Sequence, residues 1–111
     1  MKKYKKTLHE GFKKRNFELV QINRDSEDLP WWVEEKWIIR NEANKRLIVN
    51  FLTDRMRENG NKRVEAIALS TSEMKSYQDT DQVLLSLDMR KGNFDEKLEV
   101  FWKKFEKLLT K

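Results

Sequence analysis

Three stretches of alternating apolar and polar residues occupy the centre of the chain, and short polar segments separate them. They are Trp31–Arg40, Arg46–Asp54 and Arg63–Ser70. In the first stretch the odd-numbered positions are mostly apolar and the even-numbered positions are mixed, which is the two-residue period of a half-buried strand. The pattern therefore predicts three antiparallel strands joined as a meander.

The first turn of this meander predicts how two of the strands pair. Folding the chain about the Asn41–Lys45 loop places Leu47 opposite Ile39 and Val49 opposite Trp37. Both apolar faces then fall on the same side of the sheet. A slip of one residue would turn every side chain to the other face, so this agreement supports the pairing.

The second turn is predicted at Asn59-Gly60. Such a pair is typical of a tight hairpin, because Asn tolerates and Gly freely adopts the positive φ that a type I′ turn requires. Pairing about this turn predicts Phe51 opposite Ala68 and Thr53 opposite Ala66.

Helical spacing is present at both ends of the chain. Residues 3–15 place Tyr4, Leu8 and Phe12 on one narrow stripe, and Phe94–Leu109 carries a wider apolar stripe. Apolar residues three or four positions apart lie on one side of a helix and pack against a core. The two ends are therefore predicted to form amphipathic helices that lie on the sheet.

Two further strands and a loop complete the predicted elements. Asn16–Asn23 and Val83–Met89 alternate in polarity, and the polar segment Thr71–Gln82 is predicted to be a loop with a helical turn. Asn93 and Glu96 have the spacing of an N-cap residue and its partner at the start of the last helix.

Together these elements predict an α+β fold in a single domain that spans residues 1–111. A five-stranded, mainly antiparallel meander sheet carries the N- and C-terminal helices on one face, in the order α-β-β-β-β-β-α. The pattern leaves open whether the first strand pairs beside Trp31–Arg40 or at another edge. The predicted core consists of Leu8, Phe12, Trp37, Val49, Phe51, Leu85, Leu87, Leu98, Phe101 and Phe105.

The absence of cysteine narrows the classes of function. It excludes disulfides, thiolate nucleophiles and cysteine metal sites, and it fits a reducing compartment. No apolar run is long enough for a secretory signal or a membrane span. We therefore expect a cytoplasmic protein with no membrane partner.

The positive charge is concentrated in the first helix. Residues 1–15 hold seven Lys or Arg and one Glu, a local charge of +6, whereas the whole chain carries +5. Three interpretations remain open: a solvated helix face, a helix that docks on phosphate or another anionic surface, and a membrane-surface helix, for which the apolar stripe is small. The residues predicted for an anion or nucleic-acid contact are Lys2, Lys5, Lys6, Lys13 and Lys14.

No catalytic arrangement is visible in the sequence. His9 is the only histidine, and we expect it at the surface, without the companions of a nucleophile or metal site. Glu34 and Glu35 are neighbours on a strand and are expected on opposite faces. Glu35 falls on the apolar face, either at a strand end open to water, in an internal ion pair, or as a perturbed acid in a pocket. We expect no enzymatic activity, no cofactor and no metal.

The second face of the predicted sheet is more apolar than a face left to water usually is. A contiguous apolar patch that holds a tryptophan is typical of an interface. Contact with a protein partner or a second copy, coverage by the chain's own loops such as Thr71–Gln82, and simple exposure all remain open. The residues predicted for a protein interface are Trp32, Ile38, Ile48, Leu52, Ile67 and Leu69.

These patterns predict a small protein-interaction module, of adaptor or inhibitor type or a homodimer, that binds through the second face of the sheet. The alternative is a nucleic-acid-binding protein that uses the basic first helix. Its affinity would come from phosphate neutralisation and would fall steeply with salt. No glycine-rich clamp or recognition helix in the sequence adds support to this alternative.

Overall fold

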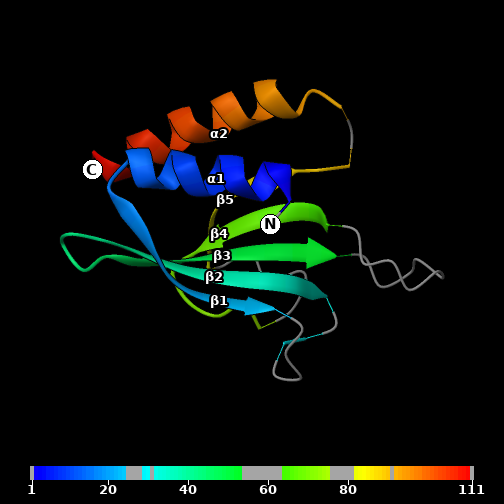
Figure 1. Cartoon of the computed structure of the whole chain (residues 1–111), viewed down its shortest axis with the longest axis horizontal. Helices are drawn as coiled ribbons and strands as arrows, with labels where there is room; N and C mark the ends of the chain where they lie inside the picture. The colour runs from blue at the N-terminus through cyan, green and yellow to red at the C-terminus, as the bar shows by residue number, and fades with distance from the viewer. Residues whose placement is uncertain are drawn as a thin grey trace.

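The computed structural model describes residues 2–24, 29–30, 32–53, 64–75, 82–90 and 92–110. Within them the chain forms two helices and five strands, shown in Figure 1. The elements are α1 (Lys3–Lys14), β1 (Phe17–Arg24), β2 (Val33–Asn41), β3 (Arg46–Thr53), β4 (Val64–Ser70), β5 (Val83–Asp88) and α2 (Phe94–Leu109). This order confirms the predicted α+β fold.

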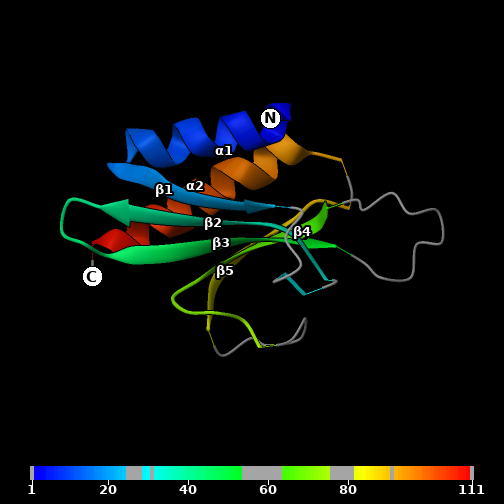
Figure 2. The same ribbon diagram turned by 60° about the horizontal axis from the view of Figure 1, so that its bottom comes forward.

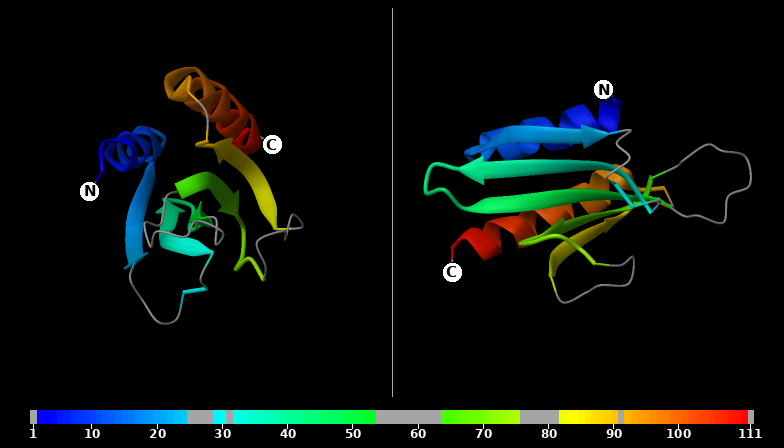
Figure 3. Two further views of the ribbon diagram at one scale, coloured as in Figure 1. Left: turned by 90° about the vertical axis from the view of Figure 1, so that its right-hand side faces the viewer. Right: turned by 90° about the horizontal axis from the view of Figure 1, so that it is seen from below.

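The five strands form one antiparallel sheet in the order β1-β2-β3-β4-β5. The first strand therefore pairs beside β2, and β1 and β5 are the two edges. Figures 1 and 3 show α1 and α2 on the same face of the sheet, with the opposite face turned away from both helices. The fold therefore has two layers, and its largest core lies between them.

The apolar stripes of both helices are buried against the sheet. Leu8 and Phe12 of α1 are fully buried, and Phe12 meets Phe105 of α2 edge to face at 5.4 Å. Asn16 ends the first helix with a φ of 68°, a left-handed conformation that Asn tolerates better than most residues. The chain can therefore turn directly from α1 into β1.

The last helix begins differently from the prediction. Asn93 is its N-cap residue, but it has a φ of 69° and its side chain makes no capping hydrogen bond. The expected Asn93 and Glu96 pair is therefore wrong as a capping interaction.

The first hairpin has the predicted register. Ile39 pairs with Leu47, and Trp37 pairs with Val49. The loop closes through the Asn44 backbone N–H, which donates to the Asn41 carbonyl at 3.0 Å, and Asn44 adopts a left-handed φ of 63°. Matching apolar faces and a suitable turn residue therefore fix this register together.

The second hairpin differs from the prediction by one residue. Phe51 pairs with Ile67 instead of Ala68, and after a register shift between Leu52 and Thr53, Thr53 pairs with Val64 instead of Ala66. The Asn59-Gly60 turn lies outside the described residues. The observed register turns Ile67 and Leu69, both fully buried, toward the helices. It leaves two alanines on the other face, so it buries more apolar area than the predicted pairing would.

The core between the layers contains all the residues predicted for it. Leu85 is the one member that is only partly buried. Trp37 and Phe51 meet at 4.8 Å on the sheet, and Phe17 meets Phe105 at 5.4 Å. Edge-to-face contacts of this kind add to the stabilisation from burial.

Candidate functional site

A cluster of charged side chains lies between α1 and the start of β2. Lys5 Nζ is 2.9 Å from Glu34 Oε2 and 3.1 Å from Glu35 Oε1. The Arg24 guanidinium approaches Glu35 Oε1 at 3.5 Å, and the Trp37 indole N–H donates to Glu35 Oε2. Of the three interpretations of Glu35, the internal ion pair is the one observed.

A bulge in β2 brings both carboxylates to this cluster. Val33 pairs with Leu52 and Glu35 with Phe51, so Glu34 is an extra residue without a partner on β3. Such a bulge breaks the strict alternation of side chains along a strand. The expectation that Glu34 and Glu35 point to opposite faces is therefore wrong, because both reach the same ammonium group.

Lys5 is not the surface anion contact that the sequence predicted, because only 4% of it is exposed. Its Nζ contacts two carboxylates and lies 5.0 Å from the centre of the Phe51 ring. The position after Tyr4 on a basic helix gave no sign of this burial. A lysine with its charge compensated inside the protein is not available to bind phosphate.

Tyr4 completes this cluster. Its hydroxyl oxygen is buried and makes no hydrogen bond with any described residue. Burial, followed by the negative charges of Glu34 and Glu35, raises the pKa of the Tyr4 phenol above its ordinary value. The groups around it are paired with one another, so we interpret the cluster as the attachment of α1 to the sheet.

Replacing Tyr4 with Phe is expected to raise the free energy of unfolding by about 1 kcal/mol at neutral pH, because it removes a buried hydroxyl without a partner. The raised pKa of Tyr4 also makes the stability of the wild type depend on pH. Above the ordinary value of 10.0 the unfolded chain loses the phenol proton while the folded chain keeps it, so the wild type loses stability as pH rises. Denaturant titrations of both proteins at neutral and alkaline pH should show a growing advantage for Tyr4→Phe. A loss of stability in the variant would contradict the unsatisfied hydroxyl.

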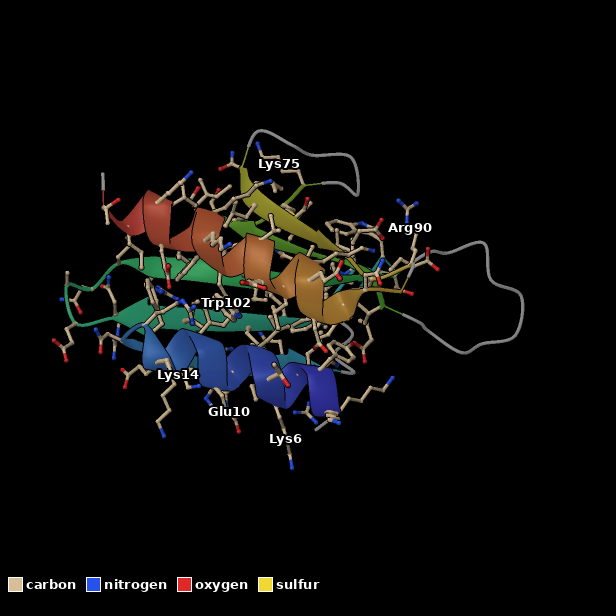
Figure 4. All side chains as sticks on the ribbon, turned by 90° about the horizontal axis from the view of Figure 1, so that it is seen from above. Lys6, Glu10, Lys14, Lys75, Arg90 and Trp102 are labelled. Atoms are coloured by element: carbon tan, nitrogen blue, oxygen red, sulfur yellow. The ribbon has the colours of Figure 1, made fainter. Side chains whose placement is uncertain are left out.

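The remaining predicted anion contacts do lie on the surface. Lys2, Lys6, Lys13 and Lys14 are exposed on or beside α1. Figure 4 shows Lys6, Glu10 and Lys14 on the side of α1 that points away from α2. His9 is half-buried rather than at the surface, with its ring 6.2 Å from that of Trp37.

The outer face of the sheet, which the helices do not cover, is partly covered by the chain itself. Trp32 is 7% exposed and packs with Leu52 and Met74. Glu73 Oε1 lies 2.6 Å from Lys36 Nζ of β2. Figure 2 shows the chain after β4 on the side of the sheet away from the helices. The segment after β4 therefore covers this end of the outer face, as one of the open interpretations proposed.

Two of the six predicted interface residues lie on the wrong face. Ile67 and Leu69 belong to the core beneath the helices, because of the register of β3 with β4. Ile38 and Ile48 pair with each other on the outer face, where Ile38 is half-buried and Ile48 is buried. The outer face thus offers less free apolar surface than the sequence predicted.

The edge of the sheet at β5 is more open. Antiparallel strands bond through alternate residues, and Met89 N–H donates to the Glu65 carbonyl at 2.9 Å. Residues 85 and 87 share this orientation, so Ser86 and Asp88 direct their backbone N–H and C=O groups away from β4. No described strand pairs with that edge. We call this row of backbone groups the β5 edge.

A groove of about 420 Å³ runs between the β5 edge and α2. Lys97 Nζ lies 3.4 Å from the Asp88 carbonyl oxygen, which agrees with that carbonyl pointing toward α2. Val100 is 50% exposed on α2, and Leu84 is 38% exposed on β5. The groove, here named the β5–α2 groove, is lined by Ser86, Leu87, Asp88, Glu96, Lys97, Val100, Phe101 and Lys104.

Sequence reasoning missed Leu84 and Val100 as surface residues of interest. Each is apolar but lies outside the core-facing stripe of its own element. An apolar residue out of phase with its stripe is the signal that could have found them, although single exposed apolar residues are common. Only the folded structure shows that Leu84 and Val100 belong to the same edge of the molecule.

Each edge strand of the sheet has one irregular residue. β1 has a register shift between Leu19 and Gln21, at Val20. β5 has one at Leu84 and pairs without interruption from Leu85 to Asp88. A bulge within an edge strand disturbs the row of backbone groups that another strand would need. The feature that distinguishes β5 is therefore the groove beside its regular part.

Within the described ranges, no three His, Cys, Asp or Glu side chains are arranged to hold a metal ion. Among the same residues, no helix has both the length and the apolar character that crossing a membrane requires. No protein-family model, no curated protein and no solved structure matches the chain. The functional assignment therefore rests on the chain's own surfaces.

Proposed function

We propose that this chain is a protein-interaction module that binds an extended protein segment along the β5 edge. The observation that supports this most is the position of Val100, an exposed apolar side chain that lines the groove together with Ser86 and Asp88. Leu84 is a second exposed apolar side chain on the same strand as Ser86 and Asp88. In strand addition, main-chain hydrogen bonds provide affinity and side-chain pockets provide specificity. A segment paired with β5 would cover Leu84 and lie beside Val100 in the β5–α2 groove.

Charge at the groove favours a protein segment with polar or mixed side chains over a purely apolar one. Glu96 and Lys104 lie on the same side of α2 as Val100 and line the groove with it. An apolar centre with a charged rim is the usual organisation of a protein interface. The proposed module therefore keeps the interaction role expected from the sequence but uses a different surface.

A random-peptide library displayed on phage, selected on the immobilised chain, tests this proposal. Peptides that bind the wild type are expected to lose at least about tenfold in affinity for Leu84→Lys, because lysine at an edge disfavours strand addition. Val20→Lys is the matched control, since Val20 is 47% exposed on the opposite edge. Failure to enrich peptides, or equal binding to the wild type and Leu84→Lys, would overturn the proposal.

The exposed lysines of α1 support a second candidate, a nucleic-acid-binding function. Lys6, Lys13 and Lys14 are exposed, and Glu10 is the only acid on the helix. If these lysines contact phosphates, replacing all three with Gln should weaken binding to random-sequence DNA and reduce the slope of its salt dependence by about 2–3. Fluorescence anisotropy at several salt concentrations measures both quantities. A slope equal to that of the wild type would exclude this role for α1.

A further inference from the structure

We infer that the partner of the β5 edge is a second copy of this chain, bound about a twofold axis that runs beside Ser86 and Val100. This inference rests on the proposed function, because it assigns a partner to the same surface. Ser86 lies in the middle of the β5 edge, and Val100 lies above it on α2, so both line one groove. One axis perpendicular to the sheet can therefore relate the two strands and the two helices together.

The regular part of β5, from Leu85 to Asp88, can pair with itself. An antiparallel pair centred on Ser86 lets the two Ser86 residues exchange both backbone hydrogen bonds, and it places Leu84 of one copy, at the bulge of β5, near Asp88 of the other. The two five-stranded sheets would then join into one continuous sheet. Such an interface is isologous, so each contact occurs twice.

The charges on α2 match the same axis. Glu96 lies four residues before Val100 and Lys104 four residues after it, and both are exposed and line the groove. Two α2 helices that cross antiparallel at Val100 place Glu96 of each copy beside Lys104 of the other. Neither side chain has an ion-pair partner among the described residues. The pattern of acid, apolar residue and base is therefore self-complementary, with the two Val100 side chains in contact at its centre.

The surface available suggests a dimer that depends on concentration. A stable interface buries roughly 800 Å² on each partner, about a tenth of a small protein's surface. The accessible surface of the chain is 7683 Å², so the β5 edge and the adjoining turns of α2 need to supply about that tenth. Exposed ion pairs add little affinity, so most of it must come from strand hydrogen bonds and from burial of Leu84 and Val100.

Sedimentation velocity at increasing protein concentration tests the dimer. The mass is expected to rise from the 13.5 kDa of one chain toward twice that value. Glu96→Lys and Lys104→Glu each turn two attractive contacts into repulsive ones and should raise the dimer dissociation constant roughly tenfold. The double variant Glu96→Lys/Lys104→Glu exchanges the charges and should restore dimerisation.

The neighbouring pair of Glu99 and Lys103 provides matched controls. These side chains are exposed on α2, lie 3.8 Å apart as an ion pair and do not line the groove. Glu99→Lys and Lys103→Glu should therefore leave the dissociation constant unchanged. A dimer that responds equally to these controls and to the Glu96 and Lys104 variants would overturn the proposed geometry.

The two proposals fail in different ways. A chain that stays monomeric at every concentration, yet binds selected peptides in a manner that depends on Leu84, overturns the second copy as partner and keeps the interaction module. A monomer that binds no peptide overturns both. A dimer without rescue in the double variant shows association through another surface and overturns the inference.

Discussion

Lys5→Met is expected to lower the free energy of unfolding by about 3–5 kcal/mol, because it removes one partner of a buried ion pair and leaves the other charged. Both carboxylates that contact Lys5 Nζ lie within 3.1 Å of it, and Glu35 is at least as deeply buried as Lys5. Arg24 lies 3.5 Å from Glu35 but is half exposed, so it compensates only part of the lost charge. Denaturant titration followed by tryptophan fluorescence measures the loss.

Lys6→Met is the matched control for this experiment. Lys6 is the next residue on α1, and its side chain points to solvent, as Figure 4 shows. Its replacement should change stability by less than about 0.5 kcal/mol. Equal effects of the two substitutions would contradict the buried position of Lys5.

A further variant distinguishes the loss of the ion pair from the loss of packing around the Lys5 side chain. In the triple variant Lys5→Met/Glu34→Gln/Glu35→Gln no net charge is left buried, and replacing a buried ion pair by neutral groups is often close to neutral. We therefore expect the triple variant to recover a large part of the stability that Lys5→Met loses. If it is less stable than Lys5→Met, the cost lies in packing around the lysine stem and not in the unpaired carboxylates.

Most of the fold could be predicted from the sequence because each element carries a strong local pattern. The wide stripe of α2 and the paired faces of the first hairpin are signals within single elements or adjacent ones. Leu47 opposite Ile39 follows from a short loop and two matching faces, and it is observed. Regular alternation is thus sufficient to predict the register of two strands where no bulge interrupts it.

The errors about which face of the sheet a residue occupies have one physical origin, which is the irregular residue in a strand. The bulge at Glu34 turns two neighbouring carboxylates toward one lysine, and the register of β3 with β4 moves Ile67 and Leu69 into the core. A bulge adds one residue to one strand and has no strong signal in composition. Every prediction that counted alternate positions across such a point was therefore placed on the wrong face.

The candidate surface could not be predicted because it depends on which strand is an edge. Leu84 and Val100 are separated by a turn and part of a helix, and nothing in their spacing relates them. Among the described strands, β5 has β4 as its one neighbour, and α2 lies beside its other side. The sequence indicated a surface for protein interaction, but the outer face it pointed to is partly covered by Met74 and the chain around it.

Gly11→Ala is expected to destabilise the protein by about 2 kcal/mol, although alanine is the better helix former. A Cβ atom at Gly11 would lie 2.1 Å from Trp102 Cζ2, far inside van der Waals contact. The indole cannot move away easily, because Phe12 packs against it at 5.0 Å and the Arg15 guanidinium lies 4.2 Å from its ring centre. Figure 4 shows Trp102 between the two helices. Overpacking costs about 1–3 kcal/mol, which exceeds the gain of about 1 kcal/mol from helix propensity.

Two further experiments test whether the clash with Trp102 is the cause: Gly92→Ala as a control, and Gly11→Ala in a variant that lacks the Trp102 ring. No atom lies within 4 Å of a Cβ at Gly92, so that substitution should leave stability unchanged within about 0.5 kcal/mol. In a Trp102→Leu background the ring atoms that clash are absent, and Gly11→Ala should then stabilise the chain through helix propensity. Denaturant titration measures the effect of Gly11→Ala on the free energy of unfolding in both backgrounds. If this effect changes sign, Gly11 is needed because α1 and α2 approach each other closely there. If Gly11→Ala stabilises the chain even with Trp102 in place, the two helices are farther apart than the packing of Trp102 on Gly11 requires.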